Sequence, residues 1–550
     1  MSRTGGELLI DCLEAQGVTT AFGVPGESYL AVLDALHDSP IRFVLCRQEG
    51  GAAFMAEAWG KLDGRPGIAF VTRGPGATNA SIGVHSAKQA STPMILFVGQ
   101  VAREMRDREA FQEVSYREFF GTVAKWSVEI DDPARVPEIV SRAFHVAMSG
   151  RPGPVVVGLP EDMLSEATDA APCGRAEPAS AGADPAAMEA LAQRLTAAER
   201  PVVFVGGGGW NGQGRTDLQR FAEAWDLPVV ASFRCQDLID NHSPSYVGDA
   251  GTGMLAATKA LFRDSDLVLA VGVGFSEIET DSYTIFDIPE PKQPVVHVHG
   301  SDLEIGKVIR PALAIHAGVN GFVKAAAELP PTNRPWGQWR ADARAAYEGS
   351  LACPAQPGGV DMGVISAHLR DALPGDAIVT NGAGNFTVWP NKFLTYGAQA
   401  RLVAPQAGAM GYGLPAGIAA RLWDPERIVV SFVGDGEIQM TMNEMGTAMQ
   451  AGAMPILLIL NNGSYGTIRM HQEREYPERV SGTDLQNPDF VAIGKAYGFH
   501  AEKVEETGQF AGAFERARAA GGGVIELTID TEALTPRATL SQIREAALAK

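Results

Sequence analysis

Short apolar runs alternate with longer amphipathic stretches along the first third of the chain. Ile68 to Thr72 and Met94 to Gly99 are two such runs, and each is followed by a stretch with helical periodicity. The pattern extends from Leu8 to about Leu164. Alternation of this kind is typical of an α/β domain built on a parallel sheet.

The same alternation occurs in two further blocks. Strands are expected in the second block at Pro201 to Val205, Leu267 to Gly272 and Val295 to Val298, and in the third at Ala377 to Thr380, Ile428 to Val433, Ile456 to Leu460 and Val524 to Ile529. The stretch from Ser165 to Pro185 is rich in Ala, Pro, Gly and Asp and is expected to be a linker. We therefore expect three doubly wound parallel-sheet α/β domains. Their expected bounds are 1–165, 191–340 and 359–535, with linkers 166–190 and 341–358 and a C-terminal tail 536–550.

Charge and composition narrow the class of protein. The chain has 550 residues, with 45 Lys and Arg against 65 Asp and Glu, which gives a formal net charge of −20. Such a chain would repel a phosphate backbone unless it had a local basic stripe, and no such stripe is visible. The N-terminus lacks an apolar signal core, and no run is long enough to span a bilayer. The five cysteines form no Cys-x-x-Cys pair. These features predict a cytoplasmic protein with reduced thiols that binds neither nucleic acid nor membrane.

The third block contains the strongest chemical signal. A strand from Arg427 to Val433 runs into Gly434, Asp435 and Gly436, and the next strand, Met454 to Leu460, runs into Asn461 and Asn462. A strand, helix, strand unit makes a right-handed crossover between parallel strands, so both strand ends emerge at the same edge of the sheet. Asp435 and Asn462 are therefore expected to converge.

This edge suits a diphosphate and a magnesium ion. Glycines let the backbone approach a ligand closely, and the helix expected after Gly436 would offer free amides to phosphate oxygens. A carboxylate, an amide oxygen and a nearby carbonyl form the sparse oxygen set that Mg²⁺ accepts when phosphate and water complete its coordination. Gly-Asp-Gly alone is a common turn, but its spacing from Asn461-Asn462 matches the thiamine diphosphate motif.

With this motif, the chain resembles the acetohydroxyacid synthase family over nearly its whole length. The matching segments are Phe22 to Gly26, Arg73 to Asn79, Arg151 to Pro154 and Met410 to Pro415. The resemblance implies that the first block binds the aminopyrimidine ring of thiamine diphosphate, that the third binds the diphosphate, and that the middle block is structural.

The resemblance also implies roles for individual residues. Glu49, which follows the apolar run Ile41 to Cys46, would hydrogen-bond the aminopyrimidine and promote loss of the thiazolium C2 proton. Gln112 would reach the reaction centre, and Met410 would wedge between the two cofactor rings. The residues expected to contact the cofactor are Pro25, Glu49, Gly384, Asn385, Gly408, Met410, Gly434, Asp435, Gly436, Asn462, Tyr465 and Gly466. Those expected to bind Mg²⁺ are Asp435, Asn462 and Ser464. A helix-cap acid, a loop amide and a core methionine are the plain structural alternatives for Glu49, Gln112 and Met410.

Several positions depart from the family pattern. His471 replaces the Trp that favours a larger acceptor, Gln48 and Phe386 each replace a His, and Ala90 replaces an Asp. His471 could act as a general acid or base beside the cofactor or be structural, and both interpretations stay open. Flavin-binding relatives carry Arg-Phe-Asp-Asp where this chain has Val273 to Glu277, so FAD is disfavoured.

The leading hypothesis is therefore a carboligase dependent on thiamine diphosphate and Mg²⁺. It would decarboxylate a pyruvate-like 2-oxo acid and transfer the acyl carbon to a second carbonyl compound, as in acetolactate synthesis. The alternative enzyme is a decarboxylase or carbon-carbon lyase with a different acyl substrate. A non-catalytic scaffold is a third hypothesis, against which Glu49, Asp435 and Asn462 argue. The resemblance further implies a homodimer or homotetramer with active sites between subunits.

Overall fold

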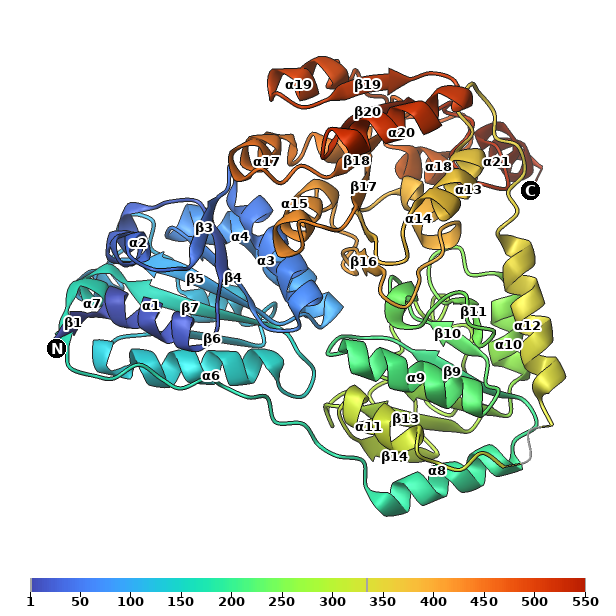
Figure 1. The fold of residues 1–550 in the computed structure, drawn as a ribbon, viewed down its shortest axis with the longest axis horizontal. Helices are drawn as coiled ribbons and strands as arrows, with labels where there is room; N and C mark the ends of the chain where they lie inside the picture. The colour runs from blue at the N-terminus through green and yellow to red at the C-terminus, as the bar shows by residue number, and fades with distance from the viewer. Residues whose placement is uncertain (1, 333–334, 550) are drawn as a thin grey trace. The chain divides into compact units, whose positions relative to one another are not determined.

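A computed structural model describes residues 2–332 and 335–549 of the chain. Residues 333 and 334, near the end of the expected central domain 191–340, lie outside the described part. Three six-stranded sheets dominate the fold, and every strand pair within them is parallel. The prediction of three parallel-sheet α/β domains is confirmed (Figure 1).

The first sheet has the strand order β3-β2-β4-β5-β7-β6. Its strands are β2 (Thr20–Gly23), β3 (Arg42–Leu45), β4 (Gly67–Val71), β5 (Met94–Gln100), β6 (Trp126–Glu129) and β7 (Pro154–Pro160). Its helices are α1 (Gly5–Ala15), α2 (Leu30–His37), α3 (Glu49–Asp63), α4 (Gly74–Ala90), α5 (Tyr116–Phe120), α6 (Val136–Met148) and α7 (Glu161–Ser165). A small antiparallel pair, β1 (Arg3–Thr4) with β8 (Ala167–Thr168), closes this part of the chain. All seven residues of β5 are buried, as expected for a central strand covered on both faces.

The central sheet has the order β11-β10-β9-β12-β13-β14. Its strands are β9 (Pro201–Val205), β10 (Val229–Ala231), β11 (Tyr246–Asp249), β12 (Leu267–Val271), β13 (Val295–His299) and β14 (Leu313–His316). Its helices are α8 (Pro185–Ala197), α9 (Gly212–Ala224), α10 (Ala256–Asp264), α11 (Val319–Ala326) and α12 (Gly337–Ser350). Side-chain caps start two of these helices, because Asp184 accepts the amide of Ala187 and Asn211 accepts that of Gly214.

The third sheet has the order β16-β15-β17-β18-β20-β19. Its strands are β15 (Ile378–Asn381), β16 (Arg401–Val403), β17 (Val429–Gly434), β18 (Ile456–Asn461), β19 (Ala501–Val504) and β20 (Gly523–Thr528). Its helices are α13 (Met362–Ala372), α14 (Val388–Lys392), α15 (Gly413–Trp423), α16 (Asp435–Ile438), α17 (Met445–Ala451), α18 (Gly466–Glu475), α19 (Phe490–Ala496), α20 (Phe510–Ala519) and α21 (Leu540–Leu548). Short 3-10 turns connect several of these elements.

The chain divides into two compact units that do not follow the three sheets. The first runs through Ala179 and also includes Pro405–Glu426 and Ile438–Pro455, which carry α15 and α17. The second contains the central sheet and the rest of the third block. Within the first unit α15 packs on α3, where the Tyr412 hydroxyl donates to the buried carboxylate of Glu57. Two connections of the third sheet thus contribute to the core of the first unit.

Three details differ from the sequence-based expectations. The helix expected after Gly436 begins at Asp435 itself and is only four residues long. The segment 341–358, expected as a linker, contains α12 as far as Ser350, with Tyr347 buried. The expected C-terminal tail contains α21, which starts at a capping box formed by Thr539 and Gln542. None of the helices in the described ranges is long and apolar enough to cross a membrane.

Candidate active site

The ends of β17 and β18 bring Asp435 to the turn that contains Asn462. The two strands are parallel neighbours with Gly434 opposite Leu460, so the chain leaves both at the same edge of the sheet. The Oδ2 atom of Asp435 accepts a hydrogen bond of 2.9 Å from the amide of Gly463. The carboxylate therefore lies against the residues that follow β18.

Burial governs the charge of Asp435, whose exposed fraction is 3%. Removal from water raises the pKa of its carboxyl group above the ordinary value, while hydrogen bonds from Asn487 and from the backbone oppose that rise. A buried carboxylate is costly unless it is paired or binds a cation. The oxygen atoms nearby belong to Asn462, whose Oδ1 accepts the Ser464 amide at 3.0 Å, and to the Ser464 carbonyl, which accepts the Gly466 amide at 2.8 Å.

The oxygen atoms of Asp435, Asn462 and Ser464 suit Mg²⁺ better than they suit a metal ion whose ligands all come from the protein. No group of three or more His, Cys, Asp or Glu side chains that could hold a metal occurs within residues 2–332 and 335–549. Asp435, Asn462 and Ser464 instead offer one carboxylate, one side-chain amide and one carbonyl. Mg²⁺ commonly uses few protein ligands and completes its shell with substrate phosphate and water.

Asn487, which is not among the residues predicted from the sequence, holds Asp435 in place. The Nδ2 atom of Asn487 donates to Asp435 Oδ2 at 2.7 Å and to Asn461 Oδ1 at 2.8 Å. Asn487 follows a segment that runs antiparallel to the Asn462 turn, with backbone hydrogen bonds between Thr483 and Tyr465 and between Leu485 and Gly463. No periodicity or motif in the sequence indicates this pairing.

The other residues predicted for the diphosphate pocket also gather at this sheet edge. The Asn385 amide donates to Thr467 Oγ1 at 2.7 Å, and Asn385 Nδ2 donates to the Leu534 carbonyl at 2.6 Å. A Cβ atom on Gly466 would lie 2.9 Å from both the Asn385 Oδ1 and the Asn462 Nδ2 atoms. Gly466 therefore lets two asparagines from different connections approach each other.

The remaining glycines of this edge are similarly confined by aromatic rings. A Cβ atom on Gly436 would lie 2.6 Å from the Tyr465 ring, and one on Gly434 would lie 3.0 Å from the Phe386 ring. Gly384 has φ +154° and would place a Cβ atom 2.7 Å from the same Phe386 ring. Side chains at these glycines would collide with the Tyr465 or Phe386 ring, which explains the residue type in physical terms.

Glu49 is the first residue of α3 in the first unit. Its Oε2 atom accepts a hydrogen bond of 2.9 Å from Asn79 Nδ2 on α4, and Asn79 is exposed. Gln48 is the N-cap residue of α3, because its side chain accepts the amide of Gly51 at 3.1 Å. Glu49 is half-buried, and a Cβ atom on the next residue, Gly50, would lie 3.4 Å from Ile82 Cγ2 on α4.

The other predicted residues of the first unit lie on loops. Pro25 is exposed in the turn after β2. Gln112 has a left-handed backbone with φ +66°, and its carbonyl accepts the amide of Gly74 at 2.9 Å at the start of α4. Gly408, also left-handed with φ +66°, and the half-buried Met410 precede α15. A non-glycine residue held in this conformation stores backbone strain, which is common at functional loops.

His471 lies on α18 and is exposed. Two residues further along the same helix, Glu473 is buried and accepts a bidentate hydrogen bond from Arg544 on α21, at 2.8 and 2.7 Å. These contacts lower the pKa of the Glu473 carboxyl group to about 2, with the Arg544 hydrogen bonds as the main cause. The face of α18 that carries Glu473 is thus structural, while His471 is accessible.

The glycine run Gly206 to Gly209, which follows β9, has a packing role. A Cβ atom on Gly207 would lie 2.2 Å from the Gly272 carbonyl oxygen, so the loops after β9 and β12 are in close contact. The Gly206 carbonyl accepts the Trp210 indole N–H at 2.9 Å, and the Gly209 carbonyl accepts Asn320 Nδ2 at 2.8 Å. Close approach of two loops accounts for these glycines without a nucleotide.

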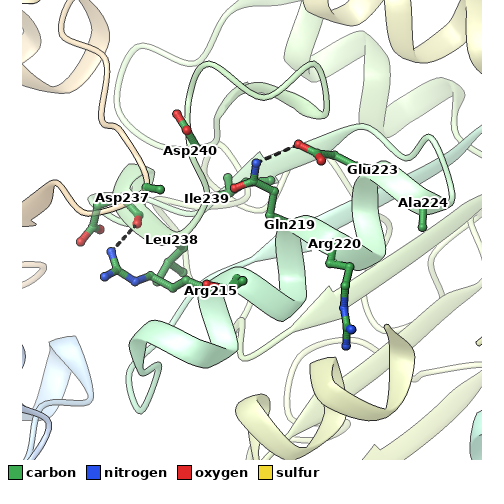
Figure 2. Close-up of a pocket in the computed structure, with 11 residues that line it drawn as sticks. Arg215, Gln219, Arg220, Glu223, Ala224, Asp237, Leu238, Ile239 and Asp240 are labelled. Atoms are coloured by element: carbon green, nitrogen blue, oxygen red, sulfur yellow. Dashed lines mark hydrogen bonds between the residues drawn. The ribbon is translucent and has the colours of Figure 1, made fainter. Parts of the chain in front are cut away.

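A cavity of about 440 Å³ also opens in the second unit, beside α9 and the turn that contains Asp237 (Figure 2). Arg215 donates to the Asp237 carbonyl at 3.1 Å, and Gln219 donates to Glu223 at 2.8 Å. The lining carries charges of both signs and contains none of the residues predicted from the sequence. We assign this cavity no part in the chemistry of the site.

Comparison with known proteins connects these sites to one family. The model of the thiamine pyrophosphate enzyme N-terminal TPP binding domain matches residues 3–119, the central-domain model matches 188–326, and the model of the C-terminal TPP binding domain matches 382–527. The chain is 30% identical to the acetolactate synthase isozyme 2 large subunit of Escherichia coli, covering 93% of this chain and 92% of that protein. It is 32% identical to the isozyme 3 large subunit of the same organism, covering 90% and 88%. It is 30% identical to the mitochondrial acetolactate synthase catalytic subunit of Saccharomyces cerevisiae, covering 92% and 77%.

Proposed function

Because this chain belongs to the thiamine pyrophosphate enzymes, and within them to the family of acetolactate synthase large subunits, we propose that it is an acetolactate synthase-like carboligase. It would remove CO₂ from a pyruvate-like 2-oxo acid and join the remaining acyl carbon to a second carbonyl compound. Thiamine diphosphate, when bound, supplies the electron sink for this chemistry. The protein supplies binding, orientation, proton transfer and exclusion of water.

The position of Asp435 carries the proposal. Its buried carboxylate lies at the shared edge of β17 and β18, directly against the turn that contains Asn462. We propose that Asp435, Asn462 and the Ser464 carbonyl bind Mg²⁺, and that the neighbouring glycines and Asn385 leave room for the diphosphate. Mg²⁺ would also offset the cost of burying the Asp435 charge.

Glu49, Gln112 and Met410 would act at the other end of the cofactor. Glu49 would hold a proton beside the aminopyrimidine ring, with Asn79 fixing the direction of its carboxylate. Gln112 would present its side chain to the substrate from a strained loop anchored on α4. Met410 would supply the apolar contact that holds the two cofactor rings in a bent arrangement.

We also propose a homo-oligomer whose active sites form between subunits. Asp435 and Asn462 belong to the second compact unit, whereas Glu49, Gln112 and Met410 belong to the first. Asn79, whose side chain donates to Glu49, is exposed. In this arrangement, Glu49 of one subunit serves the cofactor held by Asp435 of another.

The departures from the family pattern favour a second candidate reaction. The accessible His471 stands where the family has a Trp, and Gln48 and Phe386 each stand in place of a His. A titratable group near the substrate could protonate the decarboxylated carbon, and the product would then be an aldehyde. The second candidate is therefore a decarboxylase or carbon-carbon lyase with a different acyl substrate.

One experiment separates the two reactions. The purified protein, supplied with thiamine diphosphate and Mg²⁺, is incubated with a panel of 2-oxo acids and aldehydes while CO₂ release and carbon-carbon products are measured together. Carboligation predicts, in proportion to CO₂, a 2-hydroxy-3-oxo acid when the acceptor is a 2-oxo acid and a 2-hydroxy ketone when it is an aldehyde. Decarboxylation predicts an aldehyde in the same proportion, and no turnover despite bound cofactor would contradict both.

A cytoplasmic location is proposed in addition, and fractionation of the source cells would test it.

A further inference from the structure

The buried carboxylate of Glu444 accepts hydrogen bonds from the two backbone amides that precede Glu49. Glu444 ends the 3-10 turn Met442–Glu444 and has an exposed fraction of 0%. Its Oε1 atom accepts the amide of Gln48 at 2.9 Å and that of Arg47 at 3.2 Å, and its Oε2 atom lies 3.2 Å from the Arg47 amide. The Thr447 hydroxyl donates to Oε2 at 2.5 Å. All these residues belong to the first compact unit.

The surrounding residues are shaped to receive this carboxylate. A Cβ atom on Gly51 would lie 2.4 Å from Glu444 Oε1, so only glycine fits opposite it in the first turn of α3. The Arg47 side chain in turn bonds residues that follow Glu444, because it donates to the Gly446 carbonyl at 3.1 Å and to Gln450 Oε1 at 2.8 Å. The segment around Glu444 and the start of α3 therefore hold each other at several points.

Ordinary helix capping does not account for this arrangement. Gln48 already caps α3 by accepting the Gly51 amide, and the Arg47 amide precedes the helix. Burial raises the pKa of the Glu444 carboxyl group, while the hydrogen bonds from Thr447 and from the Arg47 and Gln48 amides oppose that rise. A costly buried acid that binds two consecutive amides restricts the backbone of those two residues, and Glu49 is the next residue in the chain.

We infer that Glu444 is a positioning residue for Glu49: by fixing the Arg47 and Gln48 amides, it sets the direction in which the Glu49 carboxylate leaves the start of α3. The inference rests on the proposed function, in which Glu49 acts on the aminopyrimidine ring. Glu444 follows Asp435 by nine residues in the chain. The segment 435–444 thus contains both a predicted Mg²⁺ ligand, Asp435, and the residue that positions Glu49.

The first test uses the protein without cofactor. Amide hydrogen exchange across residues 42–55 is compared in the parent, Glu444→Ala and Glu444→Gln. Glutamine keeps an oxygen that can accept both amides, whereas alanine removes it. We expect the amides of Arg47 and Gln48 to exchange at least ten times faster in Glu444→Ala and to stay near the parent rate in Glu444→Gln. Parent-level protection in Glu444→Ala would overturn the inference.

The second test measures proton transfer with thiamine diphosphate and Mg²⁺ bound. We expect Glu444→Ala to slow exchange of the thiazolium C2 proton and to lower kcat roughly 10- to 100-fold, because small misplacements of reacting groups cost about that much. KM and cofactor affinity should change far less, and Glu444→Gln should restore most of the loss. Asp361→Ala, which removes the carboxylate that caps α13, is the matched control and should keep the parent exchange rate.

The outcomes separate this inference from the proposed function. If the parent neither exchanges the C2 proton nor forms product, the proposed function is wrong. If the parent is active and Glu49→Gln is impaired while Glu444→Ala matches the parent, only the positioning role is wrong. If Glu444→Ala does not fold, Glu444→Asp replaces it, since the shorter side chain withdraws the carboxylate from the Arg47 and Gln48 amides. Parent-level amide and C2 exchange in Glu444→Asp would then overturn the inference.

Discussion

The side-chain amide of Asn487 donates a hydrogen bond of 2.7 Å to Oδ2 of Asp435. Because the same nitrogen also donates to Asn461, it ties the carboxylate to the end of β18. Partners behind a metal ligand fix its orientation, and their loss typically weakens metal binding roughly 10- to 100-fold. We expect Asn487→Ala to weaken Mg²⁺-dependent retention of thiamine diphosphate by about that factor, as measured by calorimetry. Asn320→Ala in the central domain is the control, and equal losses in both variants would contradict a specific role for Asn487.

Replacement of Asp435 itself should have a larger effect. Asp435→Ala removes the one carboxylate among the three predicted Mg²⁺ ligands. We expect Mg²⁺-dependent retention of the cofactor to be abolished while circular dichroism shows an intact fold. Titration of thiamine diphosphate in the presence and absence of Mg²⁺ measures the effect. Equal affinity in the variant and the parent would show that the metal assignment is wrong.

Glu49→Gln keeps the size of the side chain but removes the carboxylate. General acid-base groups typically contribute roughly a hundred- to ten-thousand-fold to rate, so turnover should fall on that order with a much smaller change in cofactor affinity. Exchange of the thiazolium C2 proton, followed by NMR, should slow in parallel. Exchange at the parent rate would falsify the assignment of Glu49 as the activating acid.

Activity should depend on protein concentration if active sites form between subunits. On dilution below the dissociation constant of the oligomer, we expect specific activity to fall together with the mass measured by light scattering. Mixing inactive Glu49→Gln with inactive Asp435→Ala should restore activity, because some mixed oligomers contain one site with both native residues. A fully active monomer would rule out the shared site.

The Glu473–Arg544 pair predicts how stability changes in acid. The pKa of Glu473 is about 2 in the folded protein, below its ordinary value of about 4.3 when unfolded. Its contribution to the free energy of unfolding, up to about 3 kcal/mol, is therefore present above pH 4.3 and is lost as the pH falls towards 2. Glu473→Gln should lower Tm at pH 7, and the difference from the parent should shrink in acid. A difference independent of pH would contradict an ionic origin.

The strand pattern and one motif were sufficient to predict much of the fold and the convergence of Asp435 with the Asn462 turn. Parallel strands force their ends to one edge, so position in the sequence translates directly into position in space. Asn487 and Glu444 could not be found in this way, because each lies in an irregular segment and contacts a partner far away in the sequence, so no periodic pattern indicates the contact. The α21 helix was missed for a related reason: it is held by the Arg544 ion pair with Glu473 rather than by a clear apolar face.

The assignment of α15 and α17 to the first unit limits how the chain can be recombined. A chimera that exchanged only residues up to Ala179 with a relative would place α3 from one parent against α15 from the other. Two hydrogen-bonded pairs would then combine residues from different parents. One is Glu57 with Tyr412, and the other is Glu444 with the Arg47-Gln48 backbone. These partners are inherited as one block that is discontinuous in the gene.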